Sequence, residues 1–331
     1  MKPTLALTIG DFNGIGPEVV LKSIIRDDVR TRIQPVLVGS YELFSHFAKQ
    51  LNIAVDLMPV DTVPSKIKAG TVPVLTVHPA TTKNLQIGRV APDAGVCAGA
   101  ALERAIKLCL DKTVDGMVTA PVSKESMHLA GYNFPGQTEM CAMLTRSDRV
   151  TMMLLSSTMR VALATVHIPI MKVSENITKD RLAEKFDTVS AALKNDLGIA
   201  APKIAVLGLN PHAGENGAIG MEERETIIPA VKAAQEKGLN VAGPFPADGF
   251  FASKNQTKYD AILAMYHDQG LIPLKMSGFD EGVNFSAGLK IVRTSPDHGT
   301  AFDIAGKNQA DLGSMAAAIM LAASITERRK R

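Results

Sequence analysis

Short apolar runs alternate with longer amphipathic segments along most of the chain. Several of the short runs are apolar at consecutive positions, which is typical of strands buried on both faces. The expected strands are TLALTIG at 4–10, PVLVGS at 35–40, VPVLTVH at 72–78, DGMVTAP at 115–121, TMMLLSS at 151–157, VALATVH at 161–167, IAVLGLN at 204–210, AILAMYH at 261–267 and KIVRTS at 290–295. Helical periodicity covers 17–25, 97–110, 179–197, 222–237 and 309–325. Repeated strand and helix predict α/β layers around a largely parallel sheet.

Length and composition limit the class of protein. The chain has 331 residues, of which 46% are apolar, so it is neither disordered nor a small disulfide scaffold. At roughly 100–200 residues per domain, this length predicts two domains, with a cleft possible between them. The Gly- and Pro-containing stretch at 131–136 is a candidate hinge.

Charge and aromatic content argue against nucleic-acid binding. Basic residues outnumber acidic ones by 36 to 33, but four of the basic residues form the last four positions, which we interpret as a solvated helix end. The chain has no Trp and four Tyr, so it has few aromatic rings on which bases could stack. No apolar run is long enough for a membrane span, and the first residues do not resemble a signal peptide. We therefore expect a cytoplasmic protein that acts on neither membranes nor nucleic acids.

Cysteine spacing predicts no metal or redox function for these residues. Cys97, Cys109 and Cys141 match neither a CxxC pair nor a four-thiolate zinc site. We expect them to be reduced core residues.

Three of the seven histidines follow predicted buried strands. His167 ends VALATVH, His212 comes shortly after IAVLGLN, and His267 ends AILAMYH. If these strands are parallel, the three imidazoles lie at the carboxyl edge of the sheet, where ligands bind in open α/β sheets. One ligand from each of three strands would make a divalent metal site. The alternative is that each is an ordinary hydrogen-bonded histidine at the edge of the sheet.

Other polar residues near these strands suggest anion binding or proton transfer. Lys275, Asn284 and Arg293 combine two cations with an amide, which suits a phosphate or carboxylate, although each could equally be a surface residue. Thr138 adds a hydroxyl. Asp268, next to His267, could orient that imidazole, act as a base or cap the following turn.

A glycine-rich segment near the N-terminus, TIGDFNGIGPE, invites a dinucleotide-binding interpretation. Gly10, Gly14 and Gly16 do not have the GxGxxG spacing. We therefore predict a tight turn that leads into the helix starting at Pro17.

Several motifs together resemble one family over residues 4 to about 320. These are TIGDFNGIGPE, VTAPVSKESM, FPGQTE, ATVHIP, GLNPHAGENG, ADGFF, AMYHDQGLIPLK, GVNFSAGL and IVRTSPDHGTAFDIAG. They are similar to motifs of the PdxA family, the 4-hydroxythreonine-4-phosphate dehydrogenases of pyridoxal phosphate biosynthesis. The resemblance implies NAD(P)-dependent oxidation of 4-phosphooxy-L-threonine to 2-amino-3-oxo-4-phosphooxybutanoate, which decarboxylates to 3-amino-2-oxopropyl phosphate.

The resemblance also implies which residues form the site. The family's divalent metal, which we expect to be Zn, Mg or Co, would be held by His167, His212 and His267. The residues that would bind substrate are Gln137, Thr138, Lys275, Asn284 and Arg293. Gln137 is a departure, because the family has His before Thr-Glu, and glutamine cannot carry a proton charge.

A late segment is similar to a second group of enzymes. Residues 298–308 resemble the HGSAPDIAGK loop of the isopropylmalate and isocitrate dehydrogenases, which receives the adenosine part of the cofactor. By this resemblance NAD or NADP would bind at His298, Gly299, Thr300, Asp303 and Gly306. The implied fold is two α/β/α domains with a cleft between them. We expect a cofactor domain of residues 1–130 plus about 290–331, a metal and substrate domain of about 131–289, and a homodimer with shared active sites.

Some questions stay open at the level of sequence. Asp248 and Asp268 are both candidates for the base, because each adjoins a functional motif. The alternative activities are a related dehydrogenase acting on D-threonate or D-erythronate 4-phosphate, or on a cyclic diol. A metal-dependent hydrolase or a non-catalytic sugar-acid binding protein is the alternative from another class.

Overall fold

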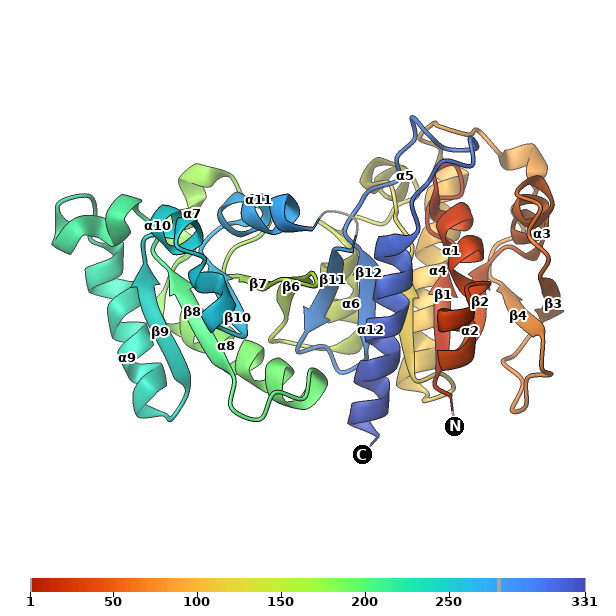
Figure 1. Cartoon of the computed structure of the whole chain (residues 1–331). Coiled ribbons are helices and arrows are strands. Elements are labelled where there is room, and N and C mark those ends of the chain that lie inside the picture. The colour runs from red at the N-terminus through yellow and green to blue at the C-terminus, as the bar shows by residue number, and fades with distance from the viewer. Residues whose placement is uncertain (1, 279–280, 331) are drawn as a thin grey trace. The chain divides into compact units, whose positions relative to one another are not determined.

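The computed structural model describes residues 2–278 and 281–330. These residues form two compact units (Figure 1). The first unit runs up to Arg146 and resumes at Lys290, and the second is Ser147–Leu289. The first unit thus includes residues 131–146, which the sequence assigned to the second domain. Helix α6 (Gln137–Thr145), which contains most of that segment, packs against α4 (Pro92–Leu110) of the first unit.

The first unit is built on a parallel sheet. Its strands are β1 (Thr4–Thr8), β2 (Gln34–Gly39), β3 (Asp56–Val60), β4 (Thr71–Thr76), β5 (Gly116–Thr119) and β12 (Arg293–Pro296). They lie in the order β3-β4-β2-β1-β5-β12, and each neighbouring pair is parallel. Strands β1 and β5 are fully or almost fully buried, as their unbroken apolar runs predict. Because all neighbouring pairs are parallel, the carboxyl ends of the six strands share one edge of the sheet.

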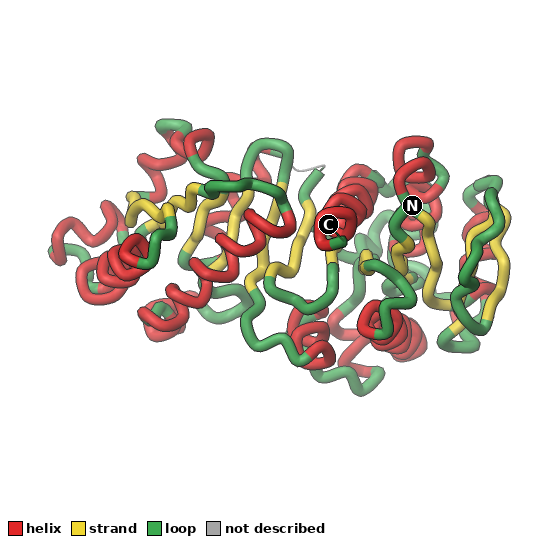
Figure 2. Tube along the Cα trace, turned by 90° about the horizontal axis from the view of Figure 1, so that it is seen from below, coloured by secondary structure: helices red, strands yellow, loops and turns green. Residues whose placement is uncertain are grey.

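Helices cover both faces of this sheet (Figure 2). Besides α4 and α6 they are α1 (Gly16–Ile24), α2 (Asp27–Arg32), α3 (Tyr41–Gln50), α5 (Lys124–Leu129) and α12 (Gly313–Arg329), with a short 3₁₀ turn η1 (Thr82–Asn84). Helix α12 packs against β5 and β12 on one face, while α4 packs with α5 and α6. Its last turn carries the exposed Arg328 and Arg329, which confirms the predicted helix end as far as the described residues reach; Arg331 lies outside them.

The second unit has a mixed sheet that is parallel over most of its width. Its strands are β6 (Thr151–Leu155), β7 (Arg160–Leu163), β8 (Lys203–Leu207), β9 (Asn240–Phe245), β10 (Ala261–Ala264) and β11 (Val283–Ala287). The order is β11-β6-β7-β10-β8-β9, in which β6 is antiparallel to both of its neighbours and the remaining pairs are parallel. The prediction of a largely parallel α/β sheet is therefore confirmed.

The core of this unit lies between the sheet and its helices. The helices are α7 (Val173–Asn176), α8 (Lys179–Ala191), α9 (Ile228–Glu236), α10 (Ala247–Ala252) and α11 (His267–Ser277). There are also π turns η3 (Ala192–Asp196) and η5 (Glu223–Ile227) and 3₁₀ segments η2 (Ile170–Lys172), η4 (Pro211–Gly217) and η6 (Asn255–Lys258). On one face, Phe250 of α10 and Leu271 and Leu274 of α11 pack onto β7, β8 and β10. This packing fixes α11 directly against the strand that precedes it.

The three cysteines lie in the interior of the protein. All three cysteines are buried and free, and burial raises the pKa of the Cys97 thiol to about 12. They are therefore protonated core residues, as predicted. In the part of the chain that the structure describes, no helix combines the length and the apolar composition that a membrane span requires.

The glycine-rich segment is a tight turn that joins β1 to α1. Gly10 has φ +70°, and α1 begins at Gly16 with Pro17 in its first turn, as the sequence predicts. Within the turn, Asp11 is fully buried and accepts hydrogen bonds from the Asn13 N–H at 2.9 Å and from Ser126 Oγ at 2.8 Å. The turn is thereby attached to α5.

The buried Asp11 predicts a specific pH dependence of stability. Burial raises the pKa of this carboxyl, and the bonds from Ser126 and Asn13 partly offset that rise. Between the unfolded-state pKa of about 3.9 and the raised folded-state pKa, the folded state binds more protons, so this group's contribution to stability falls as pH rises. We expect the free energy of unfolding of the wild type, minus that of Asp11→Asn, to decrease as pH rises over this range. Urea unfolding at several pH values would measure this difference. The exposed Asp180→Asn is the control, and a pH-independent difference would contradict the prediction.

Candidate functional site

The three predicted metal ligands follow three adjacent parallel strands. The order of these strands in the sheet is β7-β10-β8, and both pairs are parallel. His167 follows β7, His267 follows β10 as the first residue of α11, and His212 lies in η4 just after β8. The prediction that all three follow the carboxyl ends of parallel strands is confirmed.

Hydrogen bonds tie the ends of these three strands together. Thr165, which is buried, donates its hydroxyl to the carbonyl of Met265 at 2.6 Å and so joins the β7 and β10 ends. Gln269 accepts from the Met265 N–H at 2.7 Å and donates to the carbonyl of Gly208 at 2.6 Å, which joins the β10 and β8 ends. The three segments that carry the histidines therefore have a fixed spacing where they leave the sheet. Sequence reasoning missed both connecting residues.

Two of the histidines lie close enough to share an ion. The ring centroids of His167 and His267 are 5.9 Å apart. With metal–nitrogen bonds of about 2.0–2.1 Å, two imidazoles on one ion place their centroids about 5–6 Å apart. Nδ1 of His267 is 2.6 Å from Oδ1 of Asp268. Because a carboxylate accepts, this contact places the proton on Nδ1 and leaves the Nε2 lone pair available for a metal.

The third histidine lies in a segment of left-handed backbone. Residues 212–216 have φ between 42° and 78°, and four of these five residues are not glycine. This conformation costs about 1–2 kcal/mol for each non-glycine residue, so contacts to the surrounding structure must hold it. Among residues 2–278 and 281–330, no three His, Cys, Asp or Glu side chains gather closely enough to hold an ion. The described chain therefore brings together a pair of the predicted ligands, and their donor type and strand placement fit a divalent ion.

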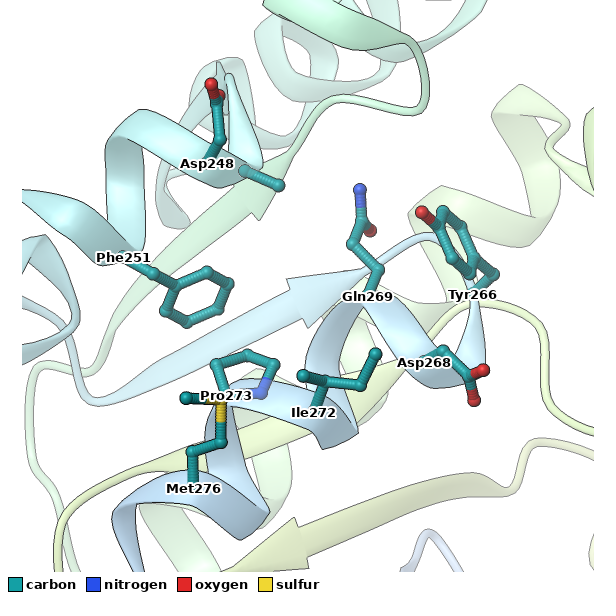
Figure 3. A pocket seen from close by; sticks show the side chains of 9 residues that line it. Asp248, Phe251, Tyr266, Asp268, Gln269, Ile272, Pro273 and Met276 are labelled. Carbon is teal, nitrogen blue, oxygen red and sulfur yellow. The ribbon is translucent and has the colours of Figure 1, made fainter.

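A pocket of about 290 Å³ lies next to His267, between α10 and α11 (Figure 3). Its wall contains apolar side chains from both helices together with the polar groups of Tyr266 and Gln269; the lining is Ala247, Asp248, Phe251, Tyr266, Asp268, Gln269, Ile272, Pro273 and Met276. Both candidate bases line it, and Figure 3 shows them on opposite sides of Gln269. Asp268 also bonds His267, so of the two carboxylates it has a demonstrated link to a predicted ligand.

A second cluster surrounds a buried arginine in the first unit. Arg293, 2% exposed, donates from Nε and Nη2 to Thr119 Oγ1 at 3.1 and 2.7 Å. It also donates to Thr138 Oγ1 at 3.2 Å and to Gln137 Oε1 at 3.3 Å. Burial lowers the pKa of the guanidinium, and Cys141 and Glu139 act in the opposite direction. The structure thus brings together three of the five predicted substrate residues, and adds Thr119.

The start of helix α6 lies at this cluster. Gln137 and Thr138 are its first two residues, and the Gln137 amide donates to the carbonyl of Ala120 at 3.4 Å. The first backbone N–H groups of a helix favour a negative charge nearby. A guanidinium, a hydroxyl and a helix start together make a site suited to a phosphate or carboxylate. Thr119 ends a strand in the VTAP motif, and its position there was the signal that could have identified it.

The other two predicted substrate residues lie in the second unit. Lys275 is in the last turn of α11, and Asn284 is on β11 opposite Leu154 of β6. Asn284 Oδ1 is buried with no hydrogen-bond partner among the described residues. An unsatisfied buried acceptor costs free energy, so a ligand group that donates to it would be favoured.

The predicted cofactor loop follows β12 and is attached to the glycine-rich turn. The Ile15 N–H donates to the carbonyl of Thr300 at 3.0 Å, and a Cβ on Gly14 would lie 2.6 Å from that same oxygen. Further along the loop, Glu18 Oε1 accepts from the Ala310 N–H at 3.0 Å. Asp303, Gly299 and Gly306 are exposed in this loop, while Nε2 of His298 is buried without a partner among the described residues. The glycine-rich turn and the 298–308 loop, which were the two candidate cofactor segments in the sequence, are therefore neighbours.

Comparison with known proteins identifies the family. The family model "Pyridoxal phosphate biosynthetic protein PdxA" matches residues 31–322. The chain belongs to the PdxA family. It is 42% identical to a 4-hydroxythreonine-4-phosphate dehydrogenase of Prosthecochloris aestuarii, with 96% of each chain covered. It is also 39% identical to a D-threonate 4-phosphate dehydrogenase of Cupriavidus necator, over 99% of this chain and 98% of that protein.

A solved structure of a PdxA relative has the same fold. The 4-hydroxythreonine-4-phosphate dehydrogenase of Klebsiella pneumoniae superposes with a TM-score of 0.87 at 38% identity, and 98% of each chain is covered. The resemblance read from the motifs is therefore confirmed for the family and for the fold.

The contacts of Arg293 predict that Thr119 contributes to stability. Thr119→Val preserves shape but removes the oxygen that accepts from two guanidinium N–H groups in the interior. We expect the free energy of unfolding to fall by about 1–3 kcal/mol, since a buried charged donor is left unsatisfied. Urea denaturation would measure this, with the exposed Thr113→Val as the matched control. Equal stability of the two variants would show that the contact contributes nothing.

Proposed function

We propose that this PdxA-family protein is an NAD(P)- and divalent-metal-dependent dehydrogenase of 4-phosphooxy-L-threonine. It oxidises the substrate's secondary alcohol to 2-amino-3-oxo-4-phosphooxybutanoate, which then loses CO₂ to give 3-amino-2-oxopropyl phosphate. The observation that carries the proposal is the full-length similarity to 4-hydroxythreonine-4-phosphate dehydrogenases, combined with three histidines placed after three adjacent parallel strands.

His167, His212 and His267 would hold the metal ion. Their neutral imidazoles suit zinc or cobalt, and magnesium is the third candidate. When bound, the ion stabilises negative charge on an oxygen of the substrate, both during oxidation and during decarboxylation. Asp268 supports this role by orienting His267 through the contact to Nδ1.

A second copy of the chain would complete the site. One chain brings His167 and His267 together, but the described residues contain no group of three suitable side chains. In a homodimer with shared active sites, the three histidines that hold one ion would come from both chains. Exposed apolar side chains near the metal residues, such as Ile272 and Met276 on α11, are consistent with such an interface.

Arg293, Thr138 and Gln137 would bind the phosphate or carboxylate of the substrate. The buried guanidinium supplies charge, and the start of α6 adds backbone N–H groups. Lys275 would add a second cation, and Asn284 would accept a hydrogen bond at its unsatisfied oxygen.

Proton and hydride transfer would use other residues. Asp268 or Asp248 would take the proton of the substrate hydroxyl, because both line the pocket beside His267. The hydride would leave to a nicotinamide whose adenosine part binds at His298, Gly299, Thr300, Asp303 and Gly306, in the loop held by the glycine-rich turn.

A second candidate is dehydrogenation of D-threonate 4-phosphate. A relative of that name is 39% identical over nearly the full length, and Gln137 stands where the family pattern has histidine. The Gln137 amide is fixed between Arg293 and the Ala120 carbonyl, so the residue contributes neutral hydrogen bonds to this part of the site.

An assay of nicotinamide reduction tests both candidates. Purified full-length protein with Zn²⁺, Mg²⁺ or Co²⁺ would be given NAD or NADP and each of the two phosphorylated substrates in turn. We expect the higher kcat/KM for 4-phosphooxy-L-threonine. Faster turnover of D-threonate 4-phosphate would assign the second activity, and no reduction of either nicotinamide would refute a dehydrogenase.

His267→Ala tests the ligand assignment. Loss of a residue that only supports a metal ligand typically lowers metal affinity about 10–100-fold. We expect a larger loss here, because His267 is itself a proposed ligand. The unfolding midpoint should change little, because the side chain is partly exposed and outside the core. Metal content after dialysis and circular dichroism would measure the two effects. His128→Ala, in the first unit, is the control, and wild-type metal content in the His267 variant would overturn the assignment.

Gln137→Glu tests the proposed anion site by charge at nearly constant shape. A carboxylate at Oε1 would pair with Arg293 and repel an incoming anion. We expect kcat/KM for the phosphorylated substrate to fall about 100-fold, which corresponds to about 2.7 kcal/mol. Gln137→Met, neutral and similar in size, is the matched control for lost hydrogen bonding. If both variants lose activity equally, charge at this position is not what matters.

A further inference from the structure

Glu223 is a buried carboxylate that binds the start of the loop carrying His212. It is the first residue of η5 and is 2% exposed. Its Oε1 accepts hydrogen bonds from the backbone N–H groups of Leu209 and Asn210, both at 2.7 Å. Its Oε2 accepts from Asn210 Nδ2 at 2.9 Å. Both carboxylate oxygens are therefore used to fix residues two and three positions before His212.

The same carboxylate also lies close to Gly214, which follows His212 in the loop. A Cβ placed on Gly208 would lie 3.2 Å from Glu223 Oε1, and one placed on Gly214 would lie 2.6 Å from Oε2. Glycine is needed at 214 both for this close approach and for its φ of +78°. The Glu223 side chain therefore lies between the residues that precede His212 and those that follow it.

A neighbouring glutamate extends this network outward. Glu222 Oε2 accepts from Asn210 Nδ2 at 2.8 Å, and its Oε1 accepts from Ser174 Oγ at 2.7 Å. Ser174 belongs to α7, so Glu222 connects the loop to a second element. Glu222 is only partly buried, whereas Glu223 is the member that fixes the backbone itself.

The left-handed backbone at residues 212–216 explains why such an anchor is needed. A free chain would rarely populate this conformation, so the position of the His212 imidazole depends on contacts made elsewhere. Before the loop, the Gly208 carbonyl is held by Gln269, and the next two N–H groups are held by Glu223. The backbone leading into His212 is thus fixed residue by residue.

We propose that Glu223 is a positioning residue for metal binding. It sets the backbone of residues 208–217 so that His212 presents its imidazole to the divalent ion. This inference rests on the proposed function in one respect, the assignment of His212 as a ligand. Glu223 acts through the loop and does not itself contact metal or substrate.

Two substitutions at this position have different expected effects. Glu223→Ala removes the acceptor of two backbone N–H groups, while the Asn210 amide keeps Glu222 as an acceptor. We expect metal affinity to fall about 10–100-fold, as for other residues that orient ligands. Glu223→Gln keeps one oxygen for the two backbone N–H groups, and these are the bonds that fix the backbone before His212. We therefore expect this conservative variant to recover most of the affinity, and it keeps the test informative if the alanine variant folds poorly.

The experiment is a titration of the metal-stripped, full-length protein with Co²⁺, followed by visible absorption, with Zn²⁺ measured by competition. Hydrogen exchange of amides 208–217 would report the loop directly and needs no activity. Glu225→Ala, an exposed glutamate two positions away, is the matched control and should bind metal as the wild type does. Faster exchange in 208–217 together with weaker Co²⁺ binding in Glu223→Ala supports the proposal.

A double-mutant cycle separates positioning from general destabilisation. If Glu223 acts through His212, then Glu223→Ala should change Co²⁺ affinity less than about twofold in a His212→Ala background. An equal loss in both backgrounds, or wild-type affinity in Glu223→Ala when His212→Ala binds weakly, would overturn the positioning role alone. Wild-type affinity in His212→Ala would instead refute the ligand assignment made under the proposed function.

Discussion

The candidate metal site depends on the hydrogen bonds that tie β7, β10 and β8 together at their carboxyl ends. Parallel pairing brings the strands to one edge, but it does not set where each chain goes after leaving the sheet. Thr165 and Gln269 do this by bonding backbone groups of Met265 and Gly208, on both sides of the central strand. The chain segment that carries each histidine therefore leaves the sheet at a fixed position. His167 and His212 are exposed and His267 is partly exposed, whereas Thr165 is buried and Gln269 partly buried. The residues that place the histidines thus lie nearer the sheet than the loops that carry the site.

The strands and their common edge could be predicted from the sequence because they depend on local patterns. Runs such as VALATV and AILAM are apolar without alternation, and this indicates a strand covered on both faces. Three strands were missed. β3 contains Pro59 and lies at the edge of its sheet, β9 contains Gly243 and Pro244, and β11 has polar Asn284 and Ser286 between its apolar residues. Proline removes a backbone donor and glycine removes a packing group, so both residues reduce the signal of a strand.

The polar connections could not be predicted, because they join residues far apart in the sequence. Thr119 and Arg293 are 174 positions apart, and nothing in the local pattern around either one reveals that a hydroxyl meets a guanidinium. Glu223 likewise looks like any charged residue of an amphipathic helix until its position beneath the preceding loop is known. The histidines were predicted from their position after buried strands, and family motifs assigned substrate roles to Arg293 and Thr138 by likeness. They did not identify the buried partners, whose roles follow from three-dimensional contacts alone.

The discontinuous first unit has a consequence for how the protein is made. Its sheet contains β1 to β5 from the start of the chain, but its last strand, β12, and the helix that covers it, α12, come from the final forty or so residues. During synthesis on the ribosome, the whole second unit emerges before that strand does. The interrupted sheet must therefore wait with β5 uncovered on one side, while residues 147–289, which are contiguous, can complete their own sheet first. The order of the strands along the chain therefore allows the second unit to complete its sheet before the first unit can.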